Sequence, residues 1–385
     1  MKYIRNVLNG TSRILIFIMA VILFLVITSA AYLTFMYNPL IKMEITYAWP
    51  EYKGKLVIRD KKELTDFLKV YREIESIPGQ LREEDFYYLV KLEYKRNLEQ
   101  VVLDKKLKLY NPATKNYEYS PHVQSFFARH ITELDNSYFG EIITWQEIAP
   151  KIPKGKVVEL RDIEAGVTFS IKRYGGVSHA DVEPLDVRDT QILKNIYGNW
   201  SWKRRAVVAT IEGKQYAASI NGMPHGGGKI WDNDFRGHFC LHFLSSKTHG
   251  RGRIDPAHQL MIHKAGGKLS ELLDLAEPEN LTEYVLAAIV SEDLLPIRYI
   301  VEGHVEETIW NGLKGIRYIA VNRVYQKEGG DHAAAVEVDA TFYKENTADF
   351  SRRVVFMEYT MDEVRNSWRL KRETLVNLYN EVLKE

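Results

Sequence analysis

The sequence predicts a multidomain α+β protein that begins with a transmembrane helix, and three observations lead to this fold class. The chain has 385 residues, a length typical of two to three domains. An apolar segment near its start contains no charged side chain. After this segment, stretches with the twofold alternation of strands are interspersed with stretches that have the periodicity of amphipathic helices.

The apolar segment, residues 14–36, is long enough to cross a bilayer, since a helix rises about 1.5 Å per residue and this one would span about 34 Å. A lysine and two arginines in the preceding tail, residues 1–13, keep that tail in the cytoplasm by the positive-inside rule. We therefore expect a single-pass protein of the cell membrane whose bulk is extracytoplasmic. A cleaved signal peptide is the alternative, but its apolar region is ordinarily about 7–15 residues long.

The composition excludes several kinds of partner and site. Lys and Arg number 52 and Asp and Glu number 51, so the net charge is +1 and the basic excess typical of nucleic-acid binders is missing. No nucleic-acid partner is therefore expected. A single cysteine excludes an intramolecular disulfide and any zinc or iron–sulfur site built on several thiolates.

Residues 44–143 are predicted to form a small α+β module. Asp60 is placed to cap the N-terminus of a helix that runs to Tyr71 and carries one apolar face. Strand patterns and a second helix follow, and no arrangement of catalytic side chains is recognisable. We expect this module to be a spacer or to bind a partner protein of the cell envelope.

The segment 281–385 combines a helix with long alternating strands. Val336, Val338, Ala340 and Phe342 occupy every second position and are predicted to face inward. Helices followed by a curved antiparallel sheet resemble the NTF2-like or cystatin-like modules of many cell-surface proteins. Such a pattern indicates a fold and not a function, and envelope proteins are again the expected partners.

The middle segment, residues 144–270, is predicted to be a mainly β domain. Two of its strands are expected to form a hairpin around the turn at 212–214. The segment also holds the single cysteine, Cys240, and seven of the eleven histidines: His179, His225, His238, His242, His249, His258 and His263.

The residues around Cys240 alternate between apolar and polar. In a strand, Phe239 and Leu241 share one face, and Cys240 shares the opposite face with His238 and His242. The thiol and the imidazoles are therefore expected to point the same way, away from the apolar face.

This placement makes Cys240 a candidate nucleophile. A nucleophilic thiol needs a base within hydrogen-bonding distance and donors near the developing oxyanion. His225 and His238 are both candidate bases, and the sequence does not distinguish them. The alternative is an inert thiol, since cysteine is among the residue types most often buried.

The pattern His-Gly at 225–226, followed by Gly-His-Phe-Cys at 237–240, resembles the signature of the YkuD-type L,D-transpeptidases, which is His-Gly and then Ser-His-Gly-Cys. The resemblance implies a YkuD-like domain that acts on peptidoglycan stem peptides by acyl transfer and requires no cofactor. Cys240 is then the nucleophile, His225 the base and His238 the histidine beside the oxyanion. The predicted function is thus that of a membrane-anchored cell-wall enzyme.

Five further positions are expected to bind the oxyanion or the substrate. Gly237 and Phe239 replace the serine and the second glycine of that signature. His179 and Asp181 precede the motif, and Asp181 is placed to orient an imidazole or to bind a stem-peptide amine. Trp202 is a candidate for stacking on a sugar ring. For Asp181 and Trp202 the alternatives are an exposed loop carboxylate and ordinary packing.

Two other functions remain open. The first is that of a non-catalytic peptidoglycan-binding or envelope-assembly protein. The second is that of a zinc-dependent peptidoglycan peptidase, because histidine and carboxylate side chains are common zinc ligands. The candidate ligands for such an ion are His238, His242, His249, Asp255 and His258.

Overall fold

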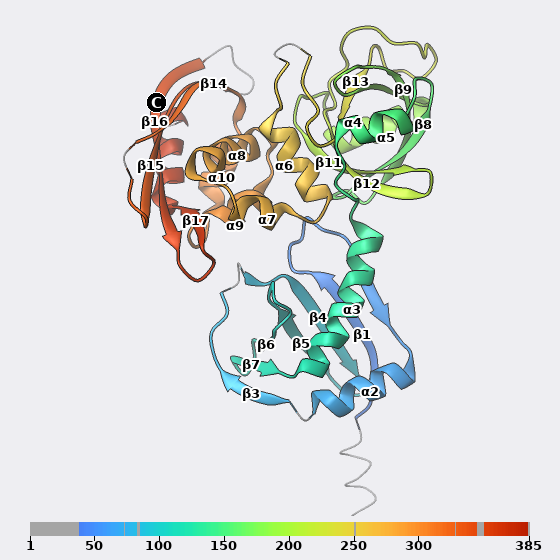
Figure 1. Cartoon of the computed structure of the whole chain (residues 1–385), viewed down its shortest axis with the longest axis vertical. Coiled ribbons are helices and arrows are strands. Elements are labelled where there is room, and N and C mark those ends of the chain that lie inside the picture. Colours follow the sequence, from blue (N-terminus) through green and yellow to red (C-terminus); the bar gives the residue numbers. More distant parts are fainter. Residues whose placement is uncertain are drawn as a thin grey trace, which may run out of the picture. The chain divides into compact units, whose positions relative to one another are not determined.

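The computed structural model describes residues 38–383, apart from residues 73, 83–84, 250–251, 328 and 345–349 (Figure 1). The chain divides into two compact units. The first unit comprises the chain up to Thr46, Leu56–Leu81 and Tyr88–Ala128, and the second comprises Tyr47–Lys55, Arg82–Tyr87 and the chain from Arg129 onward.

The first unit is built on a seven-stranded sheet with the order β2-β1-β4-β5-β6-β7-β3. The strands are β1 (Leu40–Tyr47), β2 (Lys55–Ile58), β3 (Glu75–Pro78), β4 (Tyr88–Tyr94), β5 (Leu98–Leu103), β6 (Leu109–Asn111) and β7 (Asn116–Tyr119). Helix α2 (Lys61–Tyr71) begins at the predicted cap, where the Asp60 carboxylate accepts a hydrogen bond from the Glu63 N–H. Phe67 of α2 contacts Phe126 and Phe127 of helix α3 (Pro121–Tyr138), which joins the two helices over apolar surface.

Six antiparallel strands of the second unit close into a barrel with the order β10-β13-β12-β11-β8-β9. The strands are β8 (Val157–Asp162), β9 (Thr168–Gly175), β10 (Ala180–Pro184), β11 (Arg205–Ile211), β12 (Lys214–Ile220) and β13 (Phe239–His242). The predicted hairpin between β11 and β12 is confirmed. It turns at Glu212 and Gly213, whose φ angles of 53° and 78° suit a type I′ turn. Apolar side chains from all six strands fill the barrel interior.

Helices cover the outside of this barrel. They are α4 (Trp145–Ile148) with the 3-10 turn η2 (Ala149–Lys151), α5 (Val187–Tyr197) and α6 (Pro256–Ala265). Helix α6 packs against β11, β12 and helix α8 (Pro278–Ser291), so that it lies between the barrel and the C-terminal part of the unit (Figure 1). The position of α6 matters for the site, because its side chains close the outer face of β12.

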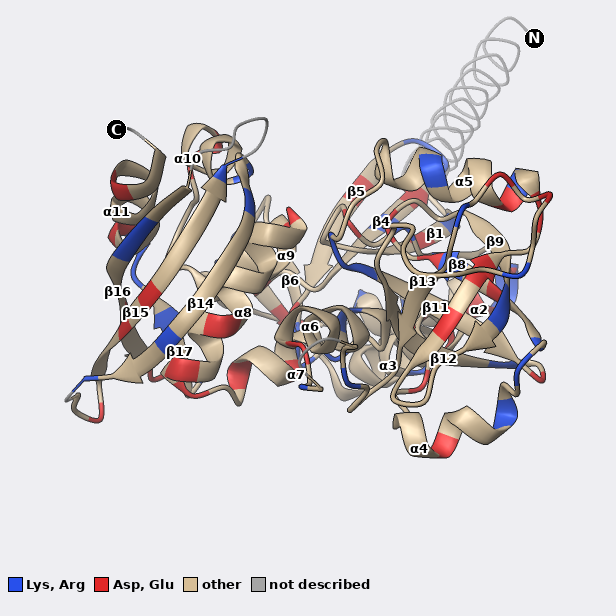
Figure 2. Ribbon diagram, turned by 90° about the horizontal axis from the view of Figure 1, so that it is seen from above, with Lys and Arg blue, Asp and Glu red and all other residues tan. Residues whose placement is uncertain are grey.

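A four-stranded antiparallel sheet forms the C-terminal part of the second unit. Its strands are β14 (Ile316–Gln326), β15 (Ala333–Lys344), β16 (Phe350–Asp362) and β17 (Ser367–Leu370), and the neighbouring helices are α7 (Leu269–Asp274), α8, α9 (Leu294–Ile300), α10 (Glu307–Leu313) and α11 (Arg372–Leu383). The predicted alternation in β15 is confirmed, since Val336, Val338, Ala340 and Phe342 are all buried. Figure 2 shows this sheet with α11 along β16, and Lys and Arg interspersed with Asp and Glu on its strands.

The predicted fold class and the predicted location need correction. Among the residues that the structure describes, no helix is both long and apolar enough to cross a bilayer. The longest of the described helices, α3, carries Arg129, Glu133 and Asp135 and is therefore amphipathic. The described residues form an α+β fold with two open sheets and a six-stranded barrel. The fold class with a transmembrane helix is thus wrong, as is the single-pass location; the segment 14–36 lies outside the described residues.

A buried ion network ties α6 to the rest of the second unit. The Lys264 ammonium is fully buried and lies 2.6 Å from carboxylate oxygens of both Glu164 and Asp293. Burial by itself would lower the pKa of Lys264, but the two carboxylates outweigh that effect and raise it. The lysine is therefore charged and forms an ion pair with each of the two acids.

Replacing Lys264 by methionine should destabilise the protein strongly. The variant leaves the buried Asp293 carboxylate without its cation and removes one of the two cations beside Glu164, which also lies 3.5 Å from Arg205; breaking a buried pair in this way costs about 3–5 kcal/mol. Urea unfolding followed by circular dichroism measures the loss. Lys268→Met is the matched control, because Lys268 forms an exposed pair with Glu271 and its loss should cost less than about 1 kcal/mol. Equal unfolding free energies for the two variants would contradict this role.

Candidate active site

The candidate site lies on the outer face of the barrel, where β10 pairs with β13. Asp181 of β10 and Cys240 of β13 are direct cross-strand partners, so their side chains leave the sheet on the same side. Phe239 and Leu241 point into the barrel interior and are fully buried. The predicted alternation is therefore confirmed: the thiol shares the outer face with its two neighbouring histidines.

The outer face is covered although it carries polar groups. Cys240 is only 5% exposed, and His179 and His242 are buried beside it. The connection from β12 to β13 folds back over the sheet, and a two-residue bridge between His225 and His238 holds it, with N–H to carbonyl distances of 3.0 and 2.9 Å. The thiol is thus shielded from bulk water by histidine-bearing loops.

Two glycines are required by this close packing. Gly226 has a φ of 59°, and a Cβ there would lie 2.6 Å from the His238 ring. Gly237 has a φ of 108°, and a Cβ there would lie 2.6 Å from the His225 carbonyl oxygen. The Gly237 position, predicted to bind the oxyanion or substrate, therefore allows the His225 backbone to approach His238.

His225 is one of the histidines in contact with the thiol. Its Nε2 lies 3.4 Å from the Cys240 Sγ, and its Nδ1 lies 2.8 Å from the Met223 carbonyl oxygen. Because a carbonyl oxygen only accepts hydrogen bonds, the His225 Nδ1 carries a proton, and its N–H donates a hydrogen bond to the Met223 carbonyl oxygen. This hydrogen bond fixes the ring, so that Nε2 faces the sulfur.

Two further imidazoles are oriented in the same way. His179 donates from Nδ1 to the Lys247 carbonyl oxygen at 2.7 Å, and His238 donates from Nδ1 to the Gly227 carbonyl oxygen at 2.7 Å. In each case Nε2 is left to face the interior of the cluster. The backbone carbonyls of three loop residues thus aim three imidazoles at one region.

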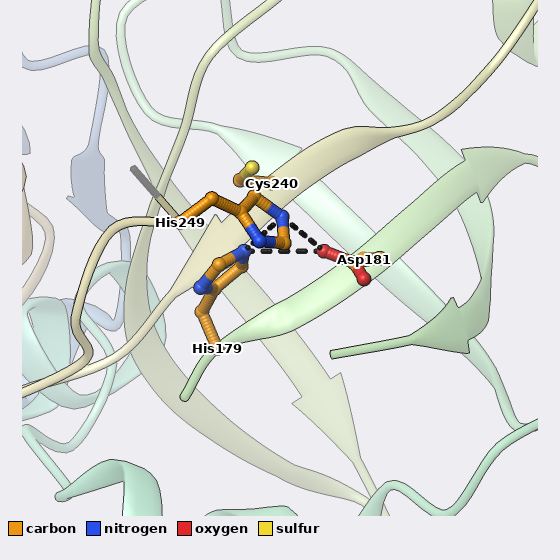
Figure 3. A group of neighbouring side chains, drawn as sticks. All are labelled: His179, Asp181, Cys240 and His249. Carbon is orange, nitrogen blue, oxygen red and sulfur yellow. Dashed lines mark hydrogen bonds and ion pairs between the residues drawn. The ribbon is translucent and has the colours of Figure 1, made fainter. Parts of the chain in front are cut away.

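Asp181 is the carboxylate of this cluster (Figure 3). Its Oδ1 lies 2.9 Å from the His249 Nε2, 3.1 Å from the His179 Nε2 and 3.6 Å from the His238 Nε2. The exposed loop carboxylate that the sequence left open is not what the structure shows, because Asp181 is buried. The carboxylate instead holds imidazoles, which was the other expectation for it.

The cluster favours a thiolate. Burial raises the pKa of Cys240, but hydrogen bonds from His179, His225 and His242 outweigh this and lower it to about 3. For His179, burial lowers the pKa, yet hydrogen bonds to Asp181 and Cys240 raise it to about 10. At neutral pH the cluster therefore holds a thiolate beside an imidazolium, with Asp181 as the second anion.

His242 and His258 have a different role. Their rings stack 3.7 Å apart at an angle of 2°, and the His258 Nδ1 lies 2.8 Å from the Ser219 Oγ. Burial lowers the pKa of both well below the usual value, so both rings are neutral. They fill the space between β12, β13 and α6 as polar packing.

The zinc ligands suggested by the sequence are therefore not brought together as a set. Asp255 caps the N-terminus of α6 through the Ala257 N–H and pairs with Arg204 at 2.6 Å. His258 lies in the stack with His242. Of the suggested ligands, His238 and His249 reach the cluster around Asp181.

The remaining predicted residues lie inside or at the border of the site. The side chain of Phe239 does not reach the site, because the twofold alternation of β13 turns it into the barrel interior. Trp202 is half exposed, and its ring centroid lies 4.9 Å from that of His225. Its indole is placed to contact a molecule that approaches the thiol.

Some functional groups were not foreseen. The carbonyl acceptors of Met223, Gly227 and Lys247 give no signal in a sequence, because every residue has such a group. Tyr174 of β9 stacks on the His238 ring, with 5.7 Å between centroids. Its place in an alternating strand was the only available signal, and that signal does not identify a partner.

No protein-family model matches the chain, and no curated protein matches it significantly. The similarity to YkuD-type L,D-transpeptidases therefore rests on the motif residues at 225–226 and 237–240 and remains a prediction.

Cys240 should remain a thiolate through the mildly acidic range. Its pKa of about 3 means that it becomes protonated only as the pH falls to about 3, whereas an ordinary cysteine is protonated below about 8.5. The chain has one cysteine, so the ultraviolet thiolate absorbance of the wild-type chain minus that of Cys240→Ser reports this group. The difference should stay constant between about pH 8 and pH 5.

The same titration shows whether the cluster is what lowers the pKa of Cys240. His179→Ala removes the imidazolium and should move the transition to higher pH. His332→Ala is the control, since that side chain is 76% exposed and outside the cluster; it should leave the transition unchanged. A wild-type transition near pH 8, as in a free cysteine, would show that the ion pair does not form.

Proposed function

We propose that this chain is a cysteine-dependent acyltransferase that acts on peptidoglycan stem peptides. The observation that carries the proposal is the contact of 3.4 Å between the Cys240 Sγ and the His225 Nε2, with the His225 Nδ1 held by the Met223 carbonyl. A nucleophile, a base within reach and a group that orients the base are the parts that covalent acyl transfer requires.

The first half-reaction forms a thioester. The Cys240 sulfur attacks the carbonyl carbon of a stem-peptide amide, and a C–S bond forms. The C–N bond of that amide then breaks, and the leaving amine takes a proton from the Nε2 of His225, whose pKa is raised by its hydrogen bond to Cys240. One amide and one thiolate–imidazolium pair thus yield a thioester, a free amine and a neutral histidine.

The second half-reaction restores the enzyme. An amine of another stem peptide attacks the thioester carbonyl and gives its proton to the His225 Nε2. The C–S bond breaks, so the products are a new amide and the original thiolate–imidazolium pair. Water in place of the amine gives a carboxylic acid, and the reaction is then hydrolysis.

The distances favour His225 as the base over His238. His225 contacts the sulfur directly, whereas the His238 Nε2 lies 3.6 Å from Asp181 and has no hydrogen-bond partner among the described atoms. The His238 Nε2 faces the interior of the cluster. This position is where the resemblance places the histidine beside the oxyanion of the tetrahedral intermediate.

The substrate class follows from the motif resemblance and is compatible with the border of the site. Solvent reaches the cluster at Trp202 and at His249, whose side chains are each about half exposed. An aromatic face and an imidazole beside a thiolate suit a peptide that carries both apolar and polar groups.

Mass spectrometry of muropeptides tests the reaction. Full-length protein incubated with purified peptidoglycan should produce new cross-links or shortened stem peptides, and Cys240→Ala should produce neither. His225→Ala should lower the rate by about 10²–10⁴-fold, the usual contribution of a general base. His332→Ala is the exposed control and should behave as the wild type.

Two outcomes would overturn the proposal. Products that persist with Cys240→Ala would exclude the thiol as nucleophile. Unchanged peptidoglycan with the wild-type protein, together with its sedimentation with cell-wall sacculi, would support the non-catalytic binding protein instead. Circular dichroism of each variant keeps loss of folding separate from loss of chemistry.

Trp202→Ala should weaken substrate binding without changing the chemical step. The indole borders His225 but does not contact the sulfur, so its loss removes an aromatic contact worth about 1.5 kcal/mol. KM should rise roughly tenfold while kcat stays within about twofold. A fall in kcat with unchanged KM would show that Trp202 positions the base and not the substrate.

A further inference from the structure

The cluster around the thiol also has the donor set of a transition-metal site. The His179 Nε2, the Asp181 Oδ1, the Cys240 Sγ and the His249 Nε2 all lie within 4.8 Å of one another (Figure 3). The three nitrogen and oxygen atoms are closer still, with separations of 2.9, 3.1 and 2.9 Å. Two of these atoms come from strands β10 and β13, and the other two come from the loops that carry His179 and His249; all four converge on one point.

The geometry fits a tetrahedral ion. Zinc binds histidine nitrogen and carboxylate oxygen at about 2.0–2.2 Å and thiolate sulfur at about 2.3 Å, which places neighbouring ligand atoms roughly 3.3–3.6 Å apart. The observed separations of 2.9–3.1 Å are a few tenths of an ångström shorter, so a slight outward movement of the side chains admits the ion. A mixed set of nitrogen, oxygen and sulfur suits zinc and the similar ion cobalt(II).

The surroundings of the ligands support this assignment. Metal-binding histidines commonly donate their second ring N–H to a carbonyl or carboxylate, and His179 donates its Nδ1–H to the Lys247 carbonyl. The His238 Nε2 is an independent sign of a missing ligand. It is buried without a hydrogen-bond partner in the described part of the chain and lies 3.6 Å from Asp181.

A second set of donors adjoins the first. His225, His238 and His249 offer three nitrogens that also lie within 4.8 Å of one another, and His249 belongs to both sets. A fifth ligand from His238 is therefore within reach of an ion held by the first four. The unpartnered nitrogen becomes satisfied when such an ion is bound.

We propose that this cluster binds one zinc ion through His179, Asp181, Cys240 and His249, and that the bound ion blocks acyl transfer. A thiolate that donates its electron pair to zinc is no longer free to attack a carbonyl. Metal binding and the thiol reaction are thus mutually exclusive uses of Cys240. The blocking effect rests on the proposed function, whereas the metal site itself does not.

Cobalt(II) and zinc titrations of the full-length, chelator-treated protein test the site without any substrate. One equivalent of cobalt should bind and give a thiolate-to-metal charge-transfer band, which zinc should remove by displacement. Cys240→Ser should lose that band. His249→Ala should weaken binding at least about tenfold, and because His249 is half exposed its replacement spares the core. His332→Ala is the exposed control and should bind as the wild type.

The outcomes separate this inference from the proposed function. Failure to bind one equivalent of cobalt, or a band that persists with Cys240→Ser, would overturn the metal site even if acyl transfer occurs. Metal binding without acyl transfer in any metal state would leave the site standing and overturn the proposed function. If both hold, saturating zinc should abolish the transfer and a chelator should restore it; full activity with zinc bound would overturn the blocking role.

Discussion

The antiparallel pairing of β10 with β13 is the constraint on which the site depends. It sets Asp181 opposite Cys240, and the twofold alternation of each strand then distributes the neighbouring residues between two faces. Phe239 and Leu241 go to the barrel core, and the histidines go outward. A shift of the register by one residue would bury the histidines in the apolar interior and expose the aromatic rings, so the core and the site stabilise the same pairing.

A buried thiolate is costly, and much of the local structure offsets that cost. The charge of Cys240 is stabilised by imidazoles, which are themselves held by backbone carbonyls and by Asp181. Because each group depends on a partner, the network stabilises the fold only when it is complete. The stack of His242 and His258 closes it on the side of α6 with neutral rings that add no further charge.

The same features that activate a thiol also make a metal site. Both uses require a thiolate, histidines fixed through Nδ1, and a position shielded from water. What distinguishes them is the atom that approaches the sulfur, either the carbon of a carbonyl or a cation. His249 is the residue at which the two uses diverge, since it is a ligand of the ion but is not needed as the base in acyl transfer.

Much of the local structure was predictable from the sequence because it depends on neighbouring residues. The helix cap at Asp60, the hairpin turn at Glu212 and Gly213, and the alternation in β13 and β15 follow from short-range rules. The clustering of histidines near Cys240 was also visible in the sequence, but spacing left His225 and His238 as equal candidates, and the structure places His225 against the sulfur. A membrane-spanning helix, which hydropathy predicted, is not found among the described residues.

The tertiary structure decided which of the many histidines act together. His179 and Cys240 are far apart along the chain, and they meet because β10, which directly follows His179, pairs with β13. The carbonyls that orient the rings carry no sequence signal, and Asp255 and His258 looked like ligands until the packing of α6 gave them structural partners. Spacing along a chain indicates which side chains share a face, but strand pairing determines which faces meet.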